Sequence, residues 1–594
     1  IRPTAGLYSV AEHTRALIFA LADGKIPSNT GGGHNLRMIY RRAKDFIEKY
    51  DWDLDLKEVA RWNAEELEPM FPELLASMEE IEEILDVEAE KYEASRREAE
   101  KKLENLDSQP SVERMIELYE SHGVSPEMME AYGFEVPEYF YMRLGDDEET
   151  VEELEEEFDL EGLEDTEKLY YRDQKYRKCN AEVEAVRDEW IVLDRTVFYP
   201  EGGGQESDEG QIEFDEEVFD VVDVQKQDGI VVHRVPDHDL EEGDTVQAEI
   251  RWNRRKQLMQ HHSTTHMVNG AAQEVLGNHI YQAGAHKTVE KARLDITHYE
   301  KLSRERLDEI EGLVREIIQE DHKINAETLP KSEAEEEYGF RIYQGGAPPG
   351  NEIRIIKIEE TDVEACGGTH LSRTGEAGEF YITGSKRIQD GVIRLQYKAG
   401  EAAQQFMSRI ENRMEEVSDK LDAELESDPR LAQRDLCDVF SVEPEQLPDT
   451  VDRFQEESEE YGEKIKSLSD FLDRETEKEE ERSGLKTVEK AQKLFDQWKR
   501  REKKVEELEG EIEAFIEDEL EGEDDLELEV PTENVGLLIQ IVQKLSQKHE
   551  ASVTLIGEKG AVSASQTDVS AREKLERYSE NVQGDEGFAK AFDV

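Results

Sequence analysis

The chain has 594 residues, and its 146 acidic residues outnumber its 73 basic residues to give a formal net charge of −73. This length is too great for one hydrophobic core and indicates about four domains. The three cysteines, Cys179, Cys366 and Cys437, exclude a disulfide framework and favour a reducing compartment. No apolar run approaches the ~18 residues of a membrane span, so we expect a cytoplasmic protein.

The acidic excess bears on the choice of partner. It extends along almost the whole chain, and such a surface would ordinarily repel a nucleic acid. At molar salt, however, the Debye length is only ~3 Å, and this repulsion is largely screened. We therefore interpret the acidity as an adaptation to a salt-rich cytosol, and it does not exclude RNA as a partner.

Residues 1–168 are expected to form a helical domain that ends in an acidic connector. Residues 10–21 have apolar side chains at helical spacing, and the glycine-rich segment 27–33 opens into a second helix. The most basic short window of the chain lies on this second helix, at Arg37, Arg41, Arg42 and Lys44. Such a window is commonly a solvated helix face, and its functional alternative is an edge that contacts phosphates.

Short alternating segments follow from about residue 169. Residues 189–193 and 218–222 are strand-like. Between them lies Phe198-Tyr-Pro-Glu-Gly-Gly-Gly-Gln205, a glycine loop of the kind that lets the backbone approach a ligand closely, although a hairpin connection is the simpler interpretation. We expect residues 169–256 to form a β-rich, barrel-like subdomain.

Two pairs of possible metal ligands lie far apart in the sequence. His262 and His266 are four residues apart, so a helix would place both on one face. Cys366 and His370 repeat this spacing around a Gly-Gly turn. Three imidazoles and one thiolate suit zinc better than magnesium or calcium. Either pair alone can arise by chance, but together they predict a zinc site within residues 257–400.

The surroundings of this site favour a functional role over a purely structural one. A catalytic zinc site keeps one position open, whereas four protein ligands close a structural site. Here a triple-glycine loop and two basic segments, residues 251–256 and 384–391, accompany the ligands. The HExxH glutamate of metalloproteases is missing from the histidine helix, and no Ser-His-Asp pattern stands out. The residues alone therefore predict a zinc-dependent hydrolase or binding site, without naming a substrate.

Two long helices and a small terminal unit are expected in the rest of the chain. Apolar residues recur at heptad-like spacing in residues 454–472 and 494–515. This pattern indicates a helical hairpin or a dimerising coiled coil over residues 401–524. Residues 525–594 are expected to form a small α/β domain. The fold class predicted for the whole chain is multidomain α+β.

At these motifs the sequence resembles the alanyl-tRNA synthetase family, in particular its archaeal form, and the resemblance covers nearly the whole chain. Ala11-Glu-His-Thr-Arg-Ala16 and Pro27-Ser-Asn29 are similar to the family's tRNA-recognition helices. The glycine loop, the His-x3-His pair and Cys366-Gly-Gly-Thr-His370 are similar to its editing domain. The C-terminal helices and α/β unit resemble the region that assists dimerisation and tRNA binding. With the pervasive acidity, the resemblance points to a halophilic archaeon.

The resemblance implies two activities for the family member. One is ATP-dependent attachment of alanine to tRNA(Ala), with Mg²⁺, and the other is hydrolysis of mischarged seryl- or glycyl-tRNA(Ala). It implies that zinc is held by His262, His266, Cys366 and His370. It also implies catalytic roles in the editing pocket for Thr265 and Gln282.

Contacts with tRNA are implied in the N-terminal region. Asn29 matches the family residue that reads the acceptor-stem G·U pair. The usual partner of this residue is an aspartate, and this chain has Glu120 instead, which keeps the carboxylate but adds a methylene. We also expect Arg37 and Arg41 to contact the tRNA. The expected partners are thus tRNA(Ala) and, through the C-terminal helices, a second copy of the chain, with no membrane and no DNA.

One departure from the family pattern leads to a further expectation. We find no motif able to bind ATP or alanine, so we expect a fragment that lacks the class II aminoacylation core and edits without charging tRNA. Three alternatives are a stand-alone editing protein acting in trans, a non-catalytic tRNA-binding module with structural zinc, and a nuclease or phosphoesterase. The N-terminal helices argue against the first alternative. The missing Asp-His-His cluster argues against the third.

Overall fold

The computed structural model describes residues 3–29, 31–104, 162–344, 350–474, 485–521 and 523–592, with isolated residues between 109 and 160 and at 346. The chain divides into two compact units, Ile1–Gln405 and Phe406–Val594. Glu120 and most of the acidic connector lie outside the described residues. None of the helices in the described ranges is long and apolar enough to cross a membrane.

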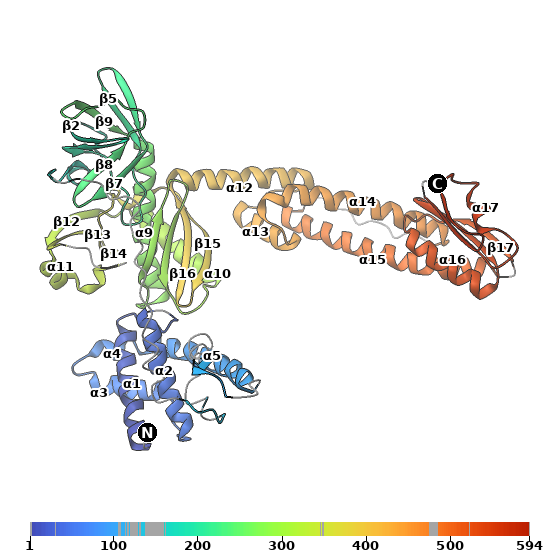
Figure 1. The fold of residues 1–594 in the computed structure, drawn as a ribbon, viewed down its shortest axis with the longest axis horizontal. Coiled ribbons are helices and arrows are strands. Elements are labelled where there is room, and N and C mark those ends of the chain that lie inside the picture. The colour runs from blue at the N-terminus through green and yellow to red at the C-terminus, as the bar shows by residue number, and fades with distance from the viewer. Residues whose placement is uncertain are drawn as a thin grey trace. The chain divides into compact units, whose positions relative to one another are not determined.

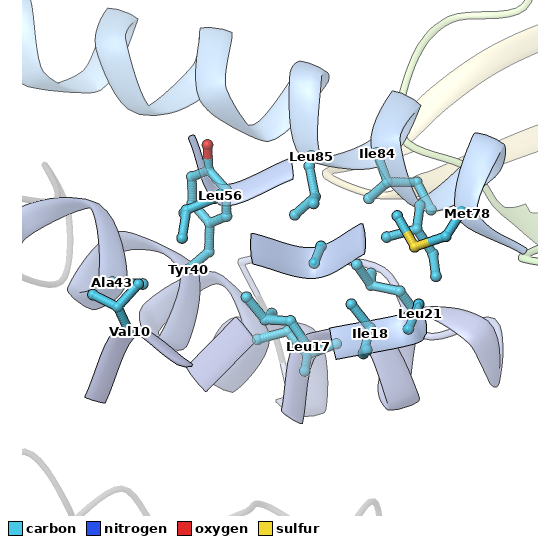
Figure 2. Packing of buried hydrophobic residues seen from close by; sticks show 14 of the residues in the cluster. Val10, Leu17, Ile18, Leu21, Tyr40, Ala43, Leu56, Met78, Ile84 and Leu85 are labelled. Carbon is cyan, nitrogen blue, oxygen red and sulfur yellow. The ribbon is translucent and has the colours of Figure 1, made fainter. Parts of the chain in front are cut away.

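The first unit begins with helices packed around an apolar core (Figures 1 and 2). Their bounds are α1 (Pro3–Ala22), α2 (Gly31–Lys49), α3 (Leu56–Leu67), α4 (Pro72–Ala76) and α5 (Met78–Glu104). The buried positions of α1 recur every three or four residues, as expected for one helical face, at Val10, Thr14, Leu17, Ile18 and Leu21. They pack against residues such as Tyr40, Leu56 and Leu85.

A seven-stranded antiparallel sheet follows, in the order β6-β5-β9-β2-β3-β8-β7. The strand bounds are β2 (Lys178–Arg187), β3 (Trp190–Leu193), β5 (Gly210–Phe214), β6 (Glu217–Val221), β7 (Asp223–Gln227), β8 (Ile230–Arg234) and β9 (Thr245–Ile250). Two short strands, β1 (Glu167–Lys168) and β4 (Arg195–Thr196), pair in parallel beside α8 (Leu169–Arg172).

The barrel-like closure expected for residues 169–256 is wrong. In the described part of the chain, β6 and β7 are the two edges of an open sheet and do not pair with each other. The long strand β2 divides its pairing instead, with residues 178–182 facing β9 and residues 183–187 facing β3. Alternating hydrophobicity identifies strands, but it carries no information about which edges pair.

The metal-ligand region is built on a long helix and two further sheets. Helix α9 (Trp252–Leu276) lies beside a four-stranded sheet, whose order is β10-β11-β16-β15 (Figure 1). These strands are β10 (Gln282–Lys287), β11 (Ala292–Thr297), β15 (Phe380–Gln389) and β16 (Val392–Ala399). Helix α10 (Arg304–Glu320) packs on α9 and is capped by Ser303, whose hydroxyl accepts a hydrogen bond from the backbone N–H of Arg306.

A three-stranded antiparallel sheet leads to the second ligand pair. Its order is β12-β13-β14, with bounds β12 (Ile324–Pro330), β13 (Glu352–Ile358) and β14 (Asp362–Ala365). Helix α11 (Lys331–Tyr338) and the short turns η2 (Phe340–Ile342) and η3 (Thr374–Ala377) complete the region. Strand β14 ends one residue before Cys366, so the sheet delivers this cysteine directly to the site.

The second unit is helical before it ends in a sheet. It begins within α12 (Gly400–Leu421), whose first six residues belong to the first unit, and continues with α13 (Pro429–Phe440), α14 (Leu447–Phe471) and α15 (Thr487–Glu519), with the turn η4 (Pro444–Gln446). Helices α14 and α15 pack against each other, so the two heptad-like seams meet within one chain. The rings of Phe454 and Trp498, one from each seam, have centroids 4.9 Å apart.

The terminal sheet has the order β17-β18-β19-β21-β20. Its elements are β17 (Asp525–Glu529), α16 (Val535–His549), β18 (Ser552–Gly557), β19 (Gly560–Ser565), α17 (Ala571–Leu575), β20 (Val582–Gly584) and β21 (Phe588–Phe592). Strands β17 and β18 are parallel and joined through α16, which packs on the sheet. Residues 525–592 thus form a mixed five-stranded sheet with two helices.

Candidate metal centre

Helix α9 carries the two predicted histidine ligands on one face. His262 and His266 are one helical turn apart, and each is only 2% exposed. Their rings stack with centroids 5.7 Å apart. Nearly every residue of α9 from Arg255 to Ala272 is buried, so both imidazoles lie in a water-poor environment.

The loop after β14 brings the other two predicted ligands to this face. The ring centroid of His370 lies 4.4 Å from that of His262. The sulfur of Cys366 lies 3.3 Å from Nε2 of His262. One ligand atom from each of His262, His266, Cys366 and His370 lies within 4.8 Å of the others. The structure therefore brings together all four residues that the sequence singled out as ligands.

Both helix imidazoles are oriented by acceptors behind them. The Nδ1 of His262 donates to Oε1 of Gln205 at 2.7 Å, and the Nδ1 of His266 donates to Oδ2 of Asp362 at 2.7 Å. A carboxylate oxygen of Glu364 lies 3.4 Å from the same Nδ1 of His266. Because amide and carboxylate oxygens only accept, each ring keeps its proton on Nδ1 and leaves Nε2 for an ion.

The electrostatic environment favours the ligand form of the cysteine. Burial raises the pKa of the Cys366 thiol. The nearby His370 and His266 lower it by more than burial raises it, so the net pKa lies well below the ordinary value. Burial also lowers the pKa values of His262 and His370 well below those of free histidines. These groups therefore present a thiolate and two neutral imidazoles, which are the protonation states that bind metal.

His266 differs in this respect. Burial lowers its pKa, but the charge of Glu364 and the hydrogen bond to Asp362 outweigh this effect and raise it well above the ordinary value. Burial and the neighbouring Asp362 in turn raise the pKa of Glu364. Two carboxyl groups thus lie together on one side of the cluster, where a bound cation would favour their charged forms.

An unsatisfied histidine tests whether the cluster suits a metal ion. Among the described residues, neither ring nitrogen of the buried His370 has a hydrogen-bond partner. A buried polar group without a partner is costly, and coordination through one nitrogen would remove that cost. A set of three nitrogens and one sulfur with these spacings fits tetrahedral zinc. The residues present therefore fit the ion that the sequence predicts.

The triple-glycine loop packs against the protein's own backbone beside this cluster. Gly204 has a φ of +70°, and a Cβ at this position would lie 2.1 Å from the carbonyl oxygen of Ala285. The backbone N–H of Lys287 donates to the carbonyl of Gly204 at 2.7 Å, and its Nζ donates to that of Gly203 at 2.9 Å. The close approach that the glycines permit is therefore to strand β10.

Gln205, the last residue of this loop, is a candidate functional residue to which sequence reasoning gave no role. It is completely buried, and its side chain contacts both His262 and Thr369. The available signal was its position directly after three glycines, in a segment already singled out. That signal identifies the loop, but the ligand that Gln205 contacts lies 57 positions away and could not be read from the spacing.

The two residues expected in the editing pocket lie on different elements. Thr265, on α9, donates its hydroxyl hydrogen to the carbonyl of His261 at 2.8 Å and accepts from the hydroxyl of Tyr397 at 2.7 Å. Gln282 starts β10, and its backbone N–H donates to Oε1 of Gln344 at 2.8 Å. The contacts fix where both residues sit, and their catalytic roles stay predictions.

The expected tRNA contacts lie on the N-terminal helices. Arg37 is only 4% exposed, and its guanidinium bonds Asn29, Glu88 and Asp390. The Nη2 of Arg41 lies 3.4 Å from the hydroxyl of Ser95. The basic window is thus partly engaged with protein groups, and contacts of Asn29, Arg37 and Arg41 with tRNA stay predictions. Glu120 is outside the described residues.

Comparison with known proteins supplies two family matches. The model described as tRNA synthetases class II (A) matches residues 3–254. The model described as threonyl and alanyl tRNA synthetase second additional domain matches residues 353–396, which include Cys366 and His370. The match to residues 3–254 contradicts the expectation that the class II core is lacking, and that expectation is wrong. It rested on a missing short ATP-binding motif, whereas a family model weighs every position of a long segment.

Several relatives are named alanine-tRNA ligase. That of Methanopyrus kandleri is 40% identical over 78% of this chain and 51% of its own length. That of Pyrococcus abyssi is 40% identical over 80% of this chain and 52% of its own, and that of Halorubrum lacusprofundi is 37% identical over 80% and 50%. The chain thus spans about half the length of the curated relatives it matches. RecJ from Thermus thermophilus aligns over 32% of the chain with 14% identity and a TM-score of 0.14, which carries no argument about fold.

Proposed function

We propose that the chain belongs to the alanyl-tRNA synthetase family and is part of an alanine-tRNA ligase whose histidine and cysteine cluster is a zinc-containing editing site. The whole enzyme would attach alanine to tRNA(Ala) with ATP and Mg²⁺. The editing site would hydrolyse seryl- and glycyl-tRNA(Ala). The observation that carries this proposal is the convergence of four soft and borderline ligands within 4.8 Å of one another.

The need for such a site follows from the chemistry of the amino acids. Serine exceeds alanine by one hydroxyl, and an apolar synthetic pocket rejects an added hydroxyl only about 100-fold. A second, hydrolytic site removes the errors that remain. The aminoacyl ester is already activated, so its hydrolysis requires mainly that the terminal ribose and a water molecule are held in place.

The residues of this chain divide that task. His262, His266, Cys366 and His370 would hold the zinc ion, which when bound supplies a positive charge that can anchor the 3′ end of the tRNA. Gln205 and Asp362 hold the helix imidazoles in the orientation that the ion needs. Thr265 and Gln282 would discriminate serine from alanine and position the ester. Burial of the cluster excludes bulk water from the ion.

We propose a salt-rich habitat and tRNA(Ala) as the partner on separate grounds. The net charge of −73 suits a protein that stays dispersed at high salt, and one relative comes from Halorubrum lacusprofundi. Asn29, Arg37 and Arg41 would contribute to recognition of the tRNA, together with Glu120. A homodimer would form through the C-terminal helices, on faces other than those that α14 and α15 use to pack together.

The test is deacylation of seryl-tRNA(Ala) and alanyl-tRNA(Ala) in high potassium chloride, with and without a chelator. We expect selective loss of serine that the chelator abolishes, and we expect His262→Ala and Cys366→Ala to abolish it as well. His322→Ala is the matched control, because the Nε2 of this partly exposed histidine bonds the surface carboxylate of Glu320. Hydrolysis of seryl-tRNA(Ala) by His262→Ala at the wild-type rate would refute the editing site. Tight tRNA binding without turnover would indicate structural zinc instead.

A further inference from the structure

One buried amide joins the two halves of the ligand cluster. The Oε1 of Gln205 accepts from Nδ1 of His262 at 2.7 Å and from the backbone N–H of Thr369 at 3.1 Å. The Nε2 of the same side chain donates to the hydroxyl of Thr369 at 2.9 Å. Gln205 and Thr369 are both completely buried. A single side chain from the glycine loop therefore connects the helix that carries His262 with the turn that carries Cys366 and His370.

The loop that carries Gln205 is itself fixed. Gly204 has a positive φ, which residues with a side chain rarely adopt, and there is no room for a Cβ beside the carbonyl of Ala285. The backbone N–H of Lys287 donates to the carbonyl of Gly204, and the carbonyl of Lys287 accepts from the backbone N–H of Glu206 at 3.2 Å. Gln205 is thus held from both sides by strand β10. Its amide is presented to the cluster by a rigid support.

We propose that Gln205 is a positioning residue for the metal ion, through His262 and the Cys366–His370 turn. This inference rests on the proposed zinc site. The amide oxygen fixes the proton of His262 on Nδ1 and so directs Nε2 to the ion. The contacts with Thr369 fix the turn between Gly368 and His370 at the same time. Gln205 therefore sets the distance between ligands that lie on separate elements.

The two helix imidazoles are supported by chemically different acceptors. His266 has the carboxylate of Asp362 behind it, whereas His262 has the neutral amide of Gln205. A carboxylate makes an imidazole a stronger electron donor than a neutral amide does. Because Cys366 already supplies a thiolate, the neutral acceptor limits the negative charge around the ion. The amide also offers an N–H that a carboxylate lacks, and Thr369 uses it.

Two substitutions separate the acceptor from the volume of the side chain. Gln205→Met keeps a similar volume but removes the acceptor, and we expect it to weaken zinc binding about 10- to 100-fold, as is usual for the loss of such partners. Gln205→Glu keeps an acceptor for Nδ1 of His262 and for the N–H of Thr369, so it should bind zinc more tightly than Gln205→Met. The measurement is the zinc dissociation constant of the whole chain, obtained by competition with a chromogenic chelator.

The cobalt-substituted protein gives a readout independent of activity. A tetrahedral site with one thiolate should give intense visible absorption bands, and Gln205→Met should shift or weaken them while Gln205→Glu retains them. Gln257→Met is the matched control, because Gln257, on α9, is a buried glutamine like Gln205. Its amide bonds His261, the carbonyl of Ala399 and the N–H of Ala402 rather than a proposed metal ligand. It should leave the zinc dissociation constant and the cobalt bands unchanged.

The outcomes distinguish this inference from the proposed function. If Gln205→Met binds zinc as tightly as the wild type and gives the same cobalt bands, Gln205 does not position the ion. If Gln205→Glu is as weak as Gln205→Met, the effect comes from packing and the inference is also refuted. If the wild-type chain binds zinc but does not hydrolyse seryl-tRNA(Ala), the editing proposal fails while the role of Gln205 stands.

Discussion

Replacing Arg37 by methionine should destabilise the first unit strongly. The Nε and Nη2 of Arg37 donate to the two carboxylate oxygens of Glu88 at 2.7 and 2.8 Å, in a two-pronged pair. Its Nη1 bonds Asn29 and Asp390. The side chains of Arg37 and Glu88 are only 5% and 2% exposed. This guanidinium therefore neutralises a carboxylate that water does not reach.

The magnitude follows from what the substitution leaves behind. Asp390 keeps two other cations, since Lys91 lies 3.2 Å from it and Arg387 also bonds it. Glu88 would be left as a buried charge without its partner, and removing one member of a buried ion pair typically costs about 3–5 kcal/mol. We expect Arg37→Met to lower the free energy of unfolding by that amount. Methionine fills most of the volume, so loss of packing contributes little.

Urea unfolding followed by circular dichroism at fixed potassium chloride concentration measures this effect. Arg304→Met is the matched control, because Arg304 pairs with Asp308 on an exposed helix face and such pairs contribute about 0–1 kcal/mol. The double variant Arg37→Met/Glu88→Leu should recover much of the loss, since it removes the uncompensated charge. A loss below about 1 kcal/mol for Arg37→Met, or no recovery in the double variant, would refute the reasoning.

Two further predictions concern the β-rich part of the first unit. Burial lowers the pKa of His233 to about 4, whereas a histidine in the unfolded chain titrates near 6.5. The unfolded state binds the additional proton between these values, so stability should fall as the pH falls from about 6.5 to 4. His233→Gln should flatten that dependence in thermal melts, and an unchanged pH profile would contradict the assignment. Gly204→Ala should lower the melting temperature more than Gly203→Ala. The reason is that a Cβ at position 204 would lie 2.1 Å from a carbonyl oxygen, whereas no atom lies within 4 Å of a Cβ at position 203. Equal melting temperatures would show that the loop can move away from β10.

The sequence predicted what depends on local spacing. The pairing of His262 with His266 needs only one helix, and the heptad-like positions around Phe454 and Trp498 need only two helices with apolar stripes. The addition of Cys366 and His370 came from ligand chemistry, which states what a zinc ion needs but not how the chain delivers it. Local pattern and metal chemistry together were therefore sufficient to select four residues that the fold brings within 4.8 Å of one another.

What the sequence could not supply depends on contacts between distant segments. Arg37 was interpreted from its basic neighbours, but the carboxylates that engage it lie 51 and 353 positions away. The same limit applied to the sheet of residues 178–250, because strand β2 alternates correctly whether its sheet is open or closed. The charge of a side chain and the alternation of a strand limit which groups or strands can pair with them. They do not determine which of these possible partners is used.

The convergence of the two ligand pairs has a physical origin in one glycine. Gly270 lies on α9 one turn after His266, and a Cβ there would lie 2.4 Å from the carbonyl oxygen of Thr361. Its missing side chain lets the start of β14 approach the helix, so that Asp362 reaches Nδ1 of His266 at 2.7 Å. From there the strand runs back along the helix, and Cys366 arrives 3.3 Å from Nε2 of His262. The strand therefore runs beside the helix and delivers Cys366 to the face that carries both imidazoles.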